Sequence, residues 1–435
     1  MAATSTIPSP TPTVGRLAAK ALTRDGHVLG ALEALHDGLG DVFALPLPGF
    51  KSVVMAGPDA NRFILTEANG DLRWRAEGDP VTRLLRRGLL VTDGAEHDDV
   101  RGMMTPALHR SLFGGYVEAM WKHTDRVSGE WRNGARINLF DEMRRIALLI
   151  LTETLFSDDF EPQMRTLWRD IERTLAYISP GAWLIWPGIP RPGYAAAIQR
   201  LVGYFDQLVA LRRARFPAQG NGDLIDALLA SGMSDDRIRD QILTMFIAGH
   251  DTSTSLLAWT LYLLAVHPES LALVVEEVDR VVGEETPALD HVRALRYLDS
   301  VIKEALRLYP PIHLGSRVAA QDLEFNGYSI PAGTRVLYSI YLTHHDRRYW
   351  PEPHLFDPGR FVADRDVSRP AYTYLPFGGG PRNCIGATFA QVEAKIVLAR
   401  LLQRHEFRYV GGKVRPRMQA TLVPHPGVFV EAWRR

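Results

Sequence analysis

Hydrophobic residues recur along most of this chain with the period of amphipathic helices, so the pattern predicts a mainly α fold with small β sheets. The longest periodic segment follows Ser234, a residue type favoured at helix N-caps, and continues to Val266. At 1.5 Å per residue this helix is about 48 Å long, enough to cross a whole domain. Further helices are predicted over Leu17–Leu35, Asp98–Leu108, Val117–Trp131, Asp141–Leu155, Met164–Ile178, Ala195–Phe216, Asp223–Ala230, Leu298–Leu308 and Ala387–Arg404.

Strand patterns are few and short. Residues 1–14 are rich in Pro, Ser and Thr, and we expect them to form a flexible tail. No repeat or linker divides residues 15–435, which we expect to form one large domain. The predicted strands are Phe43–Leu47, Ser52–Ala56, Leu323–Phe325 and Val336–Ser339.

Composition narrows the class of protein. The chain has 435 residues, 50 basic and 50 acidic side chains, and one cysteine. A single cysteine excludes internal disulfides and cysteine-rich zinc sites, and the neutral balance argues against nucleic-acid binding. The longest apolar run, Leu256–Val266, is far shorter than the ~20 residues that span a bilayer, so no integral membrane anchor is expected. With no signal-peptide pattern, the expected location is the cytoplasm.

The single cysteine lies in the segment Phe377-Gly-Gly-Gly-Pro-Arg-Asn-Cys384-Ile-Gly386, directly before the last predicted helix. Glycines leave little bulk beside the sulfur, and the N–H groups at a helix start favour a thiolate. A thiolate in such a place suits an iron ligand on one face of a haem. For the residue alone, a buried inert cysteine remains the alternative, whereas a phosphate-binding loop would need a Lys-Ser/Thr pair that this segment lacks.

Three further clusters carry possible chemistry. The polar segment Ala248–Thr252 interrupts the apolar face of the long helix, where a solvent-facing patch is the simpler interpretation. Glu304 and Arg307 are three residues apart and share a helix face, as an ordinary surface salt bridge also would. His97 and Arg101 form an H-x-x-x-R pattern on a predicted helix, and each alone is typical of a solvated side chain.

The cysteine segment resembles a known family. Phe377, Gly380, Arg382, Cys384 and Gly386 match the pattern F-x-x-G-x-R-x-C-x-G of the cytochrome P-450 superfamily, and the three other clusters follow in that family's order. The resemblance implies a single-domain P-450 fold whose long central helix crosses the haem. It also implies haem b as cofactor, with Cys384 as its axial thiolate and metal ligand.

The resemblance assigns supporting roles to distant residues. Glu304 and Arg307 would form a structural network with Arg360 behind the haem, although the family often has an acidic residue where Gly359 stands. Other residues would bind the cofactor itself, mostly through its propionates or by lying against its ring. These are His97, Arg101, Arg317, Phe377, Arg382, Gly386, Ala248 and Gly249.

By the same resemblance, Asp251 and Thr252 would be catalytic, with Thr252 near the bound oxygen and Asp251 relaying protons. Gly249 would let the helix open beside the haem. An apolar segment over residues 176–193 is interpreted as a lid and favours a lipophilic substrate, with core packing or a transient membrane contact as alternatives. The residues expected to line the substrate site are Phe246, Ala248, Ile312, His313 and Leu314.

The implied function is a haem-dependent monooxygenase that inserts one atom of O₂ into a lipophilic small molecule, by hydroxylation or epoxidation. The 49 residues after Gly386 are too few for a reductase domain, so electrons are expected from separate redox proteins such as a ferredoxin. Its basic contacts are predicted at Arg110, Arg347 and Arg348. The alternatives are a haem-thiolate isomerase, a peroxide-driven peroxygenase, and a non-catalytic haem sensor or carrier.

Overall fold

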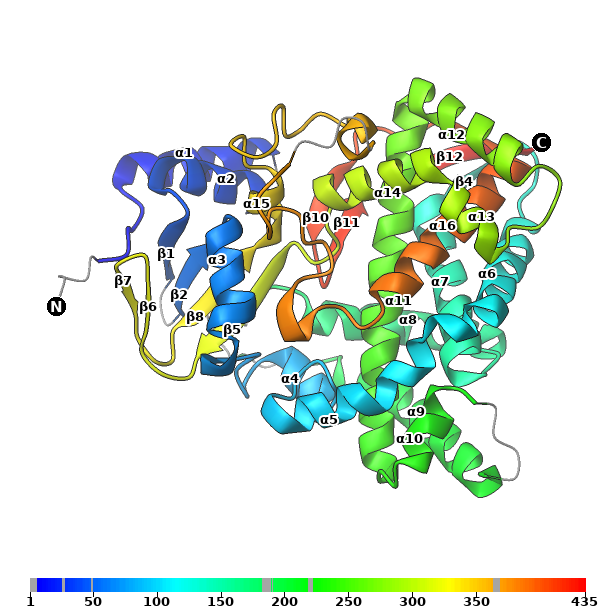
Figure 1. Ribbon diagram of the computed structural model, residues 1–435, viewed down its shortest axis with the longest axis horizontal. Coiled ribbons are helices and arrows are strands. Elements are labelled where there is room, and N and C mark those ends of the chain that lie inside the picture. The colour runs from blue at the N-terminus through cyan, green and yellow to red at the C-terminus, as the bar shows by residue number, and fades with distance from the viewer. Residues whose placement is uncertain are drawn as a thin grey trace.

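Long helices fill one side of the molecule and most strands gather on the other (Figure 1). The computed structural model describes residues 6–25, 28–47, 50–181, 189, 191–217, 222–362 and 368–435. Its architecture confirms the predicted mainly α fold with small sheets. The bounds of the longer helices, besides the central one, are α5 Gly94–Met104, α6 Phe113–Ser128, α7 Leu139–Phe156, α8 Glu161–Ile178, α9 Ala195–Arg215, α12 Pro268–Val281, α14 Arg296–Leu308 and α16 Ala387–Arg404.

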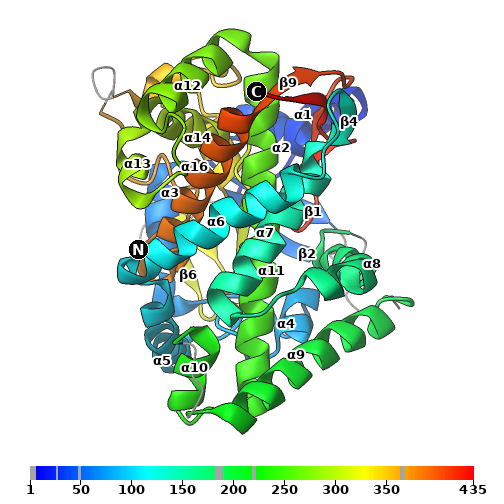
Figure 2. The ribbon, with the colours of Figure 1, turned by 90° about the vertical axis from the view of Figure 1, so that its right-hand side faces the viewer.

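The central helix α11, Asp235–Val266, ends where the apolar pattern predicted. Ser234 has the extended backbone of an N-cap, but its hydroxyl bonds the Asp236 carboxylate and caps no backbone N–H. Figure 2 shows α11 running the length of the molecule, with α7 and α16 packed against it. Because α7, α9, α14 and α16 all pack on α11, most of its side chains are buried on every face.

The N-terminal region differs from the prediction. The single helix expected over Leu17–Leu35 is two helices, α1 Pro12–Asp25 and α2 Val28–Leu39. Helix α1 begins inside the segment expected to be a flexible tail, because proline is well tolerated in a first helical turn. The Pro8 carbonyl also accepts a hydrogen bond of 2.8 Å from the Ala44 amide, which joins this segment to the first strand.

The shorter helices place loops around the core. Pro106 ends α5 early, so Thr105–Leu108 forms a 3₁₀ turn where the prediction continued the helix. The short α-helices are α3 Pro58–Arg62, α4 Pro80–Leu85, α10 Leu224–Ala230, α13 Leu289–Ala294 and α15 Ile340–His344.

The largest sheet has five strands in the order β1-β2-β8-β5-β3, and β2 and β8 run parallel. Gly315 on β5 lies opposite Tyr338 on β8, and a Cβ at this glycine would lie 2.0 Å from the tyrosine ring. The glycine therefore lets the ring lie across the strand. The strands of this sheet are β1 Val42–Leu47, β2 Phe50–Met55, β3 Leu72–Arg73, β5 Leu314–Ala319 and β8 Arg335–Ser339.

Among the described residues, three small sheets accompany the five-stranded one. One of them, the hairpin β10–β11, packs on α11, where the Leu422 carbonyl accepts hydrogen bonds from Ser255 Oγ at 2.5 Å and Trp259 Nε1 at 2.8 Å. The strands of the three small sheets are β4 Ala135–Asn138, β6 Leu323–Phe325, β7 Tyr328–Ile330, β9 His405–Tyr409, β10 Arg415–Met418, β11 Leu422–His425 and β12 Phe429–Arg434.

The main hydrophobic core lies among α6, α7, α11, α14 and α16. Two smaller clusters lie under the five-stranded sheet and beneath α1 and α2. In the part of the chain that the structure describes, no single helix is both long and apolar enough to cross a membrane. Helices α11 and α12 meet that requirement only as a pair, across a bend of 113°.

Candidate active site

The loop before α16 holds Cys384 in a fixed backbone geometry. Its amide donates a hydrogen bond of 2.9 Å to the Phe377 carbonyl, and Gly386 occupies the N-cap position of α16. Gly380 has φ +66° and packs so closely that a Cβ would lie 2.0 Å from the Leu65 carbonyl oxygen. Glycine is therefore required at that position.

The Cys384 thiol remains accessible, although protein atoms surround it. This burial raises the pKa of the thiol, and it outweighs the Gly386 N–H group and the Arg101 charge, which lower it. The helix start therefore favours the thiolate less than the sequence suggested. A bound metal ion would supply the missing stabilisation, because a thiol must be deprotonated to act as a ligand.

Basic side chains gather beside the cysteine loop. On α5, Arg101 donates to Asn383 Oδ1 at 2.8 Å, and buried His97 pairs with Asp98 at 2.8 Å. Burial lowers the pKa of His97, and the nearby charges of Arg382 and Arg101 lower it further. Arg382 in turn donates to the Asp93 carboxylate and the Thr92 carbonyl. The structure thus brings three predicted cofactor residues together.

Arg317 on β5 joins this basic group. Its positive charge is one of the causes that lower the pKa of Arg382, and Arg317 itself is buried. Arg75, which no motif marked, donates to the Ser316 carbonyl at 2.9 Å. Burial and the charge of Arg317 lower the pKa of Arg75 to about 10. Such an excess of buried positive charge is suited to binding carboxylates.

A buried ion-pair network is centred on α14. Glu304 and Arg307 on α14 are completely buried and form two bonds of 2.7 and 2.8 Å. Arg307 also donates to the carbonyls of His344 and Pro353 at 2.9 and 2.7 Å. Arg360 approaches the same Glu304 carboxylate at 3.3 Å, as the family resemblance implied. The network ties α14 to the irregular segment after β8.

No residue of the polar segment 248–252 on α11 is exposed, because His250 and Asp251 are buried and the other three are half-buried. Thr252 Oγ1 donates to the Ala248 carbonyl at 2.8 Å, so these two residues lie on one helix face. Asp251 accepts hydrogen bonds from Arg144 on α7 at 3.1 Å and from Thr421 at 2.7 Å. The solvent-facing interpretation of this segment is therefore wrong.

Gly249 packs toward α7. A Cβ at this position would lie 2.8 Å from Leu151 Cδ1, so the glycine permits close approach of the two helices. This packing accounts for the residue type without an opening of α11. An opening beside a cofactor stays a prediction.

One predicted substrate residue lies elsewhere. The Phe246 ring is fully buried, with ring centroids 5.6 Å from Phe160 and 5.1 Å from Phe205. It therefore belongs to the aromatic core between α11 and α9, and we correct its assignment. The prediction failed because residues 246 and 248 are 200° apart around the helix.

The segment after α14 shows mixed exposure. Ile312 is exposed and Leu314 is half-buried, whereas His313 is buried. Burial lowers the pKa of His313 to about 4, so the ring is neutral at physiological pH. Residues 182–188 and 190 of the predicted lid lie outside the described residues, so its role as a lid stays a prediction.

Glu393 on α16 is a titratable group that sequence reasoning missed. It is 2% exposed, and its carboxyl lies 2.5 Å from Ser253 Oγ on α11. Burial raises the pKa of this carboxyl to about 8. A lone glutamate on an amphipathic helix is usually a surface residue, and nothing in the pattern marked this one. The structure places a protonated acid against Ser253, the residue that follows Thr252 in the sequence.

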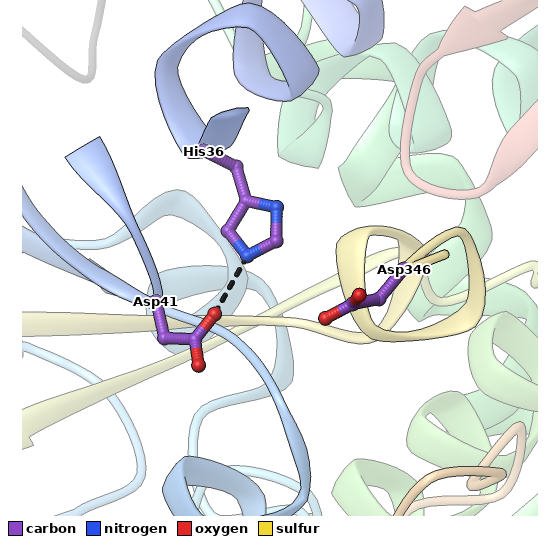
Figure 3. Close-up of side chains that lie close together, drawn as sticks. All are labelled: His36, Asp41 and Asp346. Carbon is purple, nitrogen blue, oxygen red and sulfur yellow. Dashed lines mark hydrogen bonds and ion pairs between the residues drawn. The ribbon is translucent and has the colours of Figure 1, made fainter. Parts of the chain in front are cut away.

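A second polar cluster lies away from the cysteine loop, where α2, β1 and the end of α15 meet (Figure 3). Ligand atoms of His36, Asp41 and Asp346 lie within 4.8 Å of one another, as a metal site would require. The guanidinium of Arg348, however, pairs with Asp346 and reaches Asp41 at 2.5 Å. A side-chain cation thus already neutralises these carboxylates.

These ion pairs involve one of the three arginines that were predicted to contact a redox partner protein. Arg347 and Arg348 are both exposed, but Arg348 is paired with two carboxylates. The side chain of Arg110 lies outside the described residues. A docking role for the three arginines stays a prediction.

Comparison with known proteins decides the family. A sequence profile described as Cytochrome P450 matches residues 6–431 of this chain. The chain belongs to the cytochrome P450 family. Cyclooctat-9-en-7-ol 5-monooxygenase of Streptomyces melanosporofaciens is 32% identical over 353 residues, 77% of this chain and 75% of that protein. Putative cytochrome P450 139 of Mycobacterium tuberculosis is 30% identical over 418 residues, 92% of this chain and 96% of that protein.

Membership of this P450 family establishes the reaction class and the cofactor. The protein is a P450 monooxygenase, and P450 enzymes bind haem b through a cysteine thiolate. The site fits that group on two grounds. One accessible cysteine offers a soft ligand for iron, and the basic side chains around it suit the two propionate groups of haem b.

Proposed function

We propose that this protein oxygenates a lipophilic small molecule, by hydroxylation or epoxidation, with Cys384 as the axial ligand of its haem. The observation that carries the proposal is the lone accessible cysteine at the start of α16, flanked by buried basic side chains. Bound haem b supplies the activation of O₂ and the transfer of one oxygen atom. The protein supplies the ligand, the orientation of substrate and the protons.

The loop contacts support the cofactor assignment. Arg101, Arg317 and Arg382 would hold the propionates, because their charges converge beside Cys384. His97, whose pKa is lowered, would donate a hydrogen bond to a propionate as a neutral ring. The hydrogen bond from the Cys384 amide to the Phe377 carbonyl would keep the sulfur in place.

Thr252 and Asp251 would deliver protons to the reacting oxygen. The Thr252 hydroxyl lies on the Ala248 face of α11 and can donate a proton from there. Asp251 is held by Arg144 at 3.1 Å and by Thr421 at 2.7 Å. The carboxylate must leave one of these partners to carry a proton inward, so Arg144 would control its movement.

The substrate class rests on the relatives and on the exposed apolar residue. One relative is named as a 5-monooxygenase of cyclooctat-9-en-7-ol, and another, 32% identical over 363 residues, as cyclooctatin synthase. Ala248, Ile312 and Leu314 would line the site, and buried neutral His313 would add a polar contact. Electrons would come from a separate redox protein, with a ferredoxin as the proposed donor.

The test combines a spectrum with turnover. The reduced, CO-bound protein is expected to show the long-wavelength absorbance of thiolate-ligated haem, and Cys384→Ser should lose it completely. The wild-type protein with O₂, a ferredoxin and its reductase should convert a lipophilic substrate to a product that contains one added oxygen atom. A retained thiolate band in Cys384→Ser would refute the ligand assignment, and turnover with no added oxygen would refute the reaction.

Replacing Asp251 by asparagine should slow turnover roughly 100-fold, the lower range for a positioned acid–base group. Asparagine keeps the shape and hydrogen bonds near Arg144 but cannot relay a proton. The solvent isotope effect on kcat should rise, because proton delivery becomes slower. Asp236→Asn, on the exposed first turn of α11, is the matched control. Unchanged turnover and isotope effect in Asp251→Asn would contradict the assigned role.

A further inference from the structure

A cleft of about 260 Å³ lies beside the segment that leads into the cysteine loop. Its walls are one face of α14, residues 374–378 and the first turns of α16. Figure 1 shows α14 and α16 next to each other, in agreement with their direct packing. Drug-sized ligands usually occupy pockets of about 300–1,000 Å³, so this cleft suits a smaller molecule.

The polar rim of the cleft carries excess positive charge. Lys303 on α14 and Lys395 on α16 share a single carboxylate, that of Asp299, at 2.8 and 2.7 Å. Two ammonium groups against one carboxylate leave one uncompensated positive charge. The Lys395 side chain is only 12% exposed, so its interactions are weakly screened by solvent. The rim is therefore suited to an anion.

The inner wall of the cleft is apolar and aromatic. Ile302 and Leu306 are buried side chains on the same face of α14 as the two charged residues of that helix. Phe377 and Tyr374 line the opposite wall, and the Tyr374 hydroxyl donates to the Lys303 carbonyl at 3.0 Å. A ligand that fits both parts is apolar at one end and anionic at the other, and an aromatic ring suits the aromatic wall.

We propose that this cleft is a binding site for a small aromatic carboxylate. The carboxylate lies between Lys303 and Lys395, and the ring packs against Ile302, Leu306 and Phe377. The Phe377 carbonyl accepts the hydrogen bond of the Cys384 amide, so the bound acid rests against the residue that anchors the cysteine loop. The site goes beyond the proposed oxygenation, because the ligand is not the substrate.

The experiment measures binding of 4-fluorobenzoate to the haem-loaded protein by ¹⁹F NMR. Saturating imidazole blocks the substrate side of the haem, so the remaining binding reports on other sites. We expect saturable binding, weakened about tenfold in Lys395→Met, because a charge-assisted hydrogen bond is lost. Lys303→Met is the second variant, since its side chain is 40% exposed and less important for packing. The melting temperature of each variant checks that the fold is retained.

Asp299→Asn should strengthen binding, whereas the lysine variants weaken it. This variant removes the carboxylate that competes for both lysines, so 4-fluorobenzoate should bind several-fold tighter. The neutral analogue 4-fluorobenzyl alcohol should bind about tenfold more weakly than the acid. Hydrogen exchange at the Cys384 amide should slow when the acid is bound, because the anchoring residue is covered.

Several outcomes would overturn the proposal. The proposal fails if 4-fluorobenzoate shows no saturable binding to the wild-type protein, or if imidazole abolishes all of its binding. It also fails if the lysine variants bind 4-fluorobenzoate as tightly as the wild type. A weaker affinity in Asp299→Asn would do the same. Slower reduction by a ferredoxin in the lysine variants, with unchanged 4-fluorobenzoate binding, would assign the cleft to the protein electron donor instead.

Discussion

Arg307→Met is expected to lower the free energy of unfolding by about 3–5 kcal/mol, because it leaves a buried charge without its main partner. Glu304 is completely buried, and Arg307 supplies two of its hydrogen bonds. The change also frees the buried carbonyls of His344 and Pro353. Urea unfolding of the two proteins measures the difference.

Two variants make this experiment specific. In the Asp170–Arg200 pair the arginine is 54% exposed, so Arg200→Met should cost less than about 1 kcal/mol. Glu304→Leu combined with Arg307→Leu removes both charges and should recover part of the lost stability. A loss below about 1 kcal/mol in Arg307→Met would show that the buried network contributes little.

Glu393→Gln should make stability much less dependent on pH. The pKa of Glu393 is raised from 4.5 to about 8 in the folded protein, so the native state holds a proton that the unfolded chain releases. The stability that this protonated carboxyl gives the folded protein is fully present below pH 4.5 and is lost as pH rises through 8. Between pH 5 and pH 9 the free energy of unfolding of the wild-type protein should fall by on the order of 4 kcal/mol because of this one group.

Glutamine keeps the shape and the hydrogen bond to Ser253 but does not titrate. Unfolding free energies at pH 5, 7 and 9 should therefore decline less in Glu393→Gln than in the wild type. Glu284→Gln, at an exposed position, serves as the control and should follow the wild-type profile. Coincident profiles for the wild type and Glu393→Gln would mean that Glu393 is already ionised in the folded protein.

Local patterns predicted the fold well where one physical factor dominates. Helix α11 was predicted to within a residue because its apolar run is long and bounded by clear signals at Ser234 and after Val266. The span Leu17–Leu35 was predicted as one helix although Gly26 lies within it, and glycine disfavours a helix interior by about 1 kcal/mol. Pro12 was assigned to a tail because its favourable place at a helix start was overlooked.

The candidate site was predicted only where a motif exists. The approach of Arg360 to Glu304 spans 56 residues of sequence, and only the family resemblance could suggest it. Arg75 and Glu393 belong to no motif, and their importance comes from burial, which a single sequence does not reveal. Phe246 was misplaced because sequence proximity to Ala248 is not proximity on a helix surface.

The hairpin β10–β11 matters for the construction of chimeras between related P450 enzymes. Asp251, Ser255 and Trp259 are four residues apart along α11, and all three bond to Thr421 or Leu422 at the tip of this hairpin. A crossover placed between α11 and β11 would combine a helix and a tip that did not evolve together. Recombination libraries should therefore exchange the helix and the hairpin from the same parent, so that the hydrogen bond to Asp251 is inherited intact.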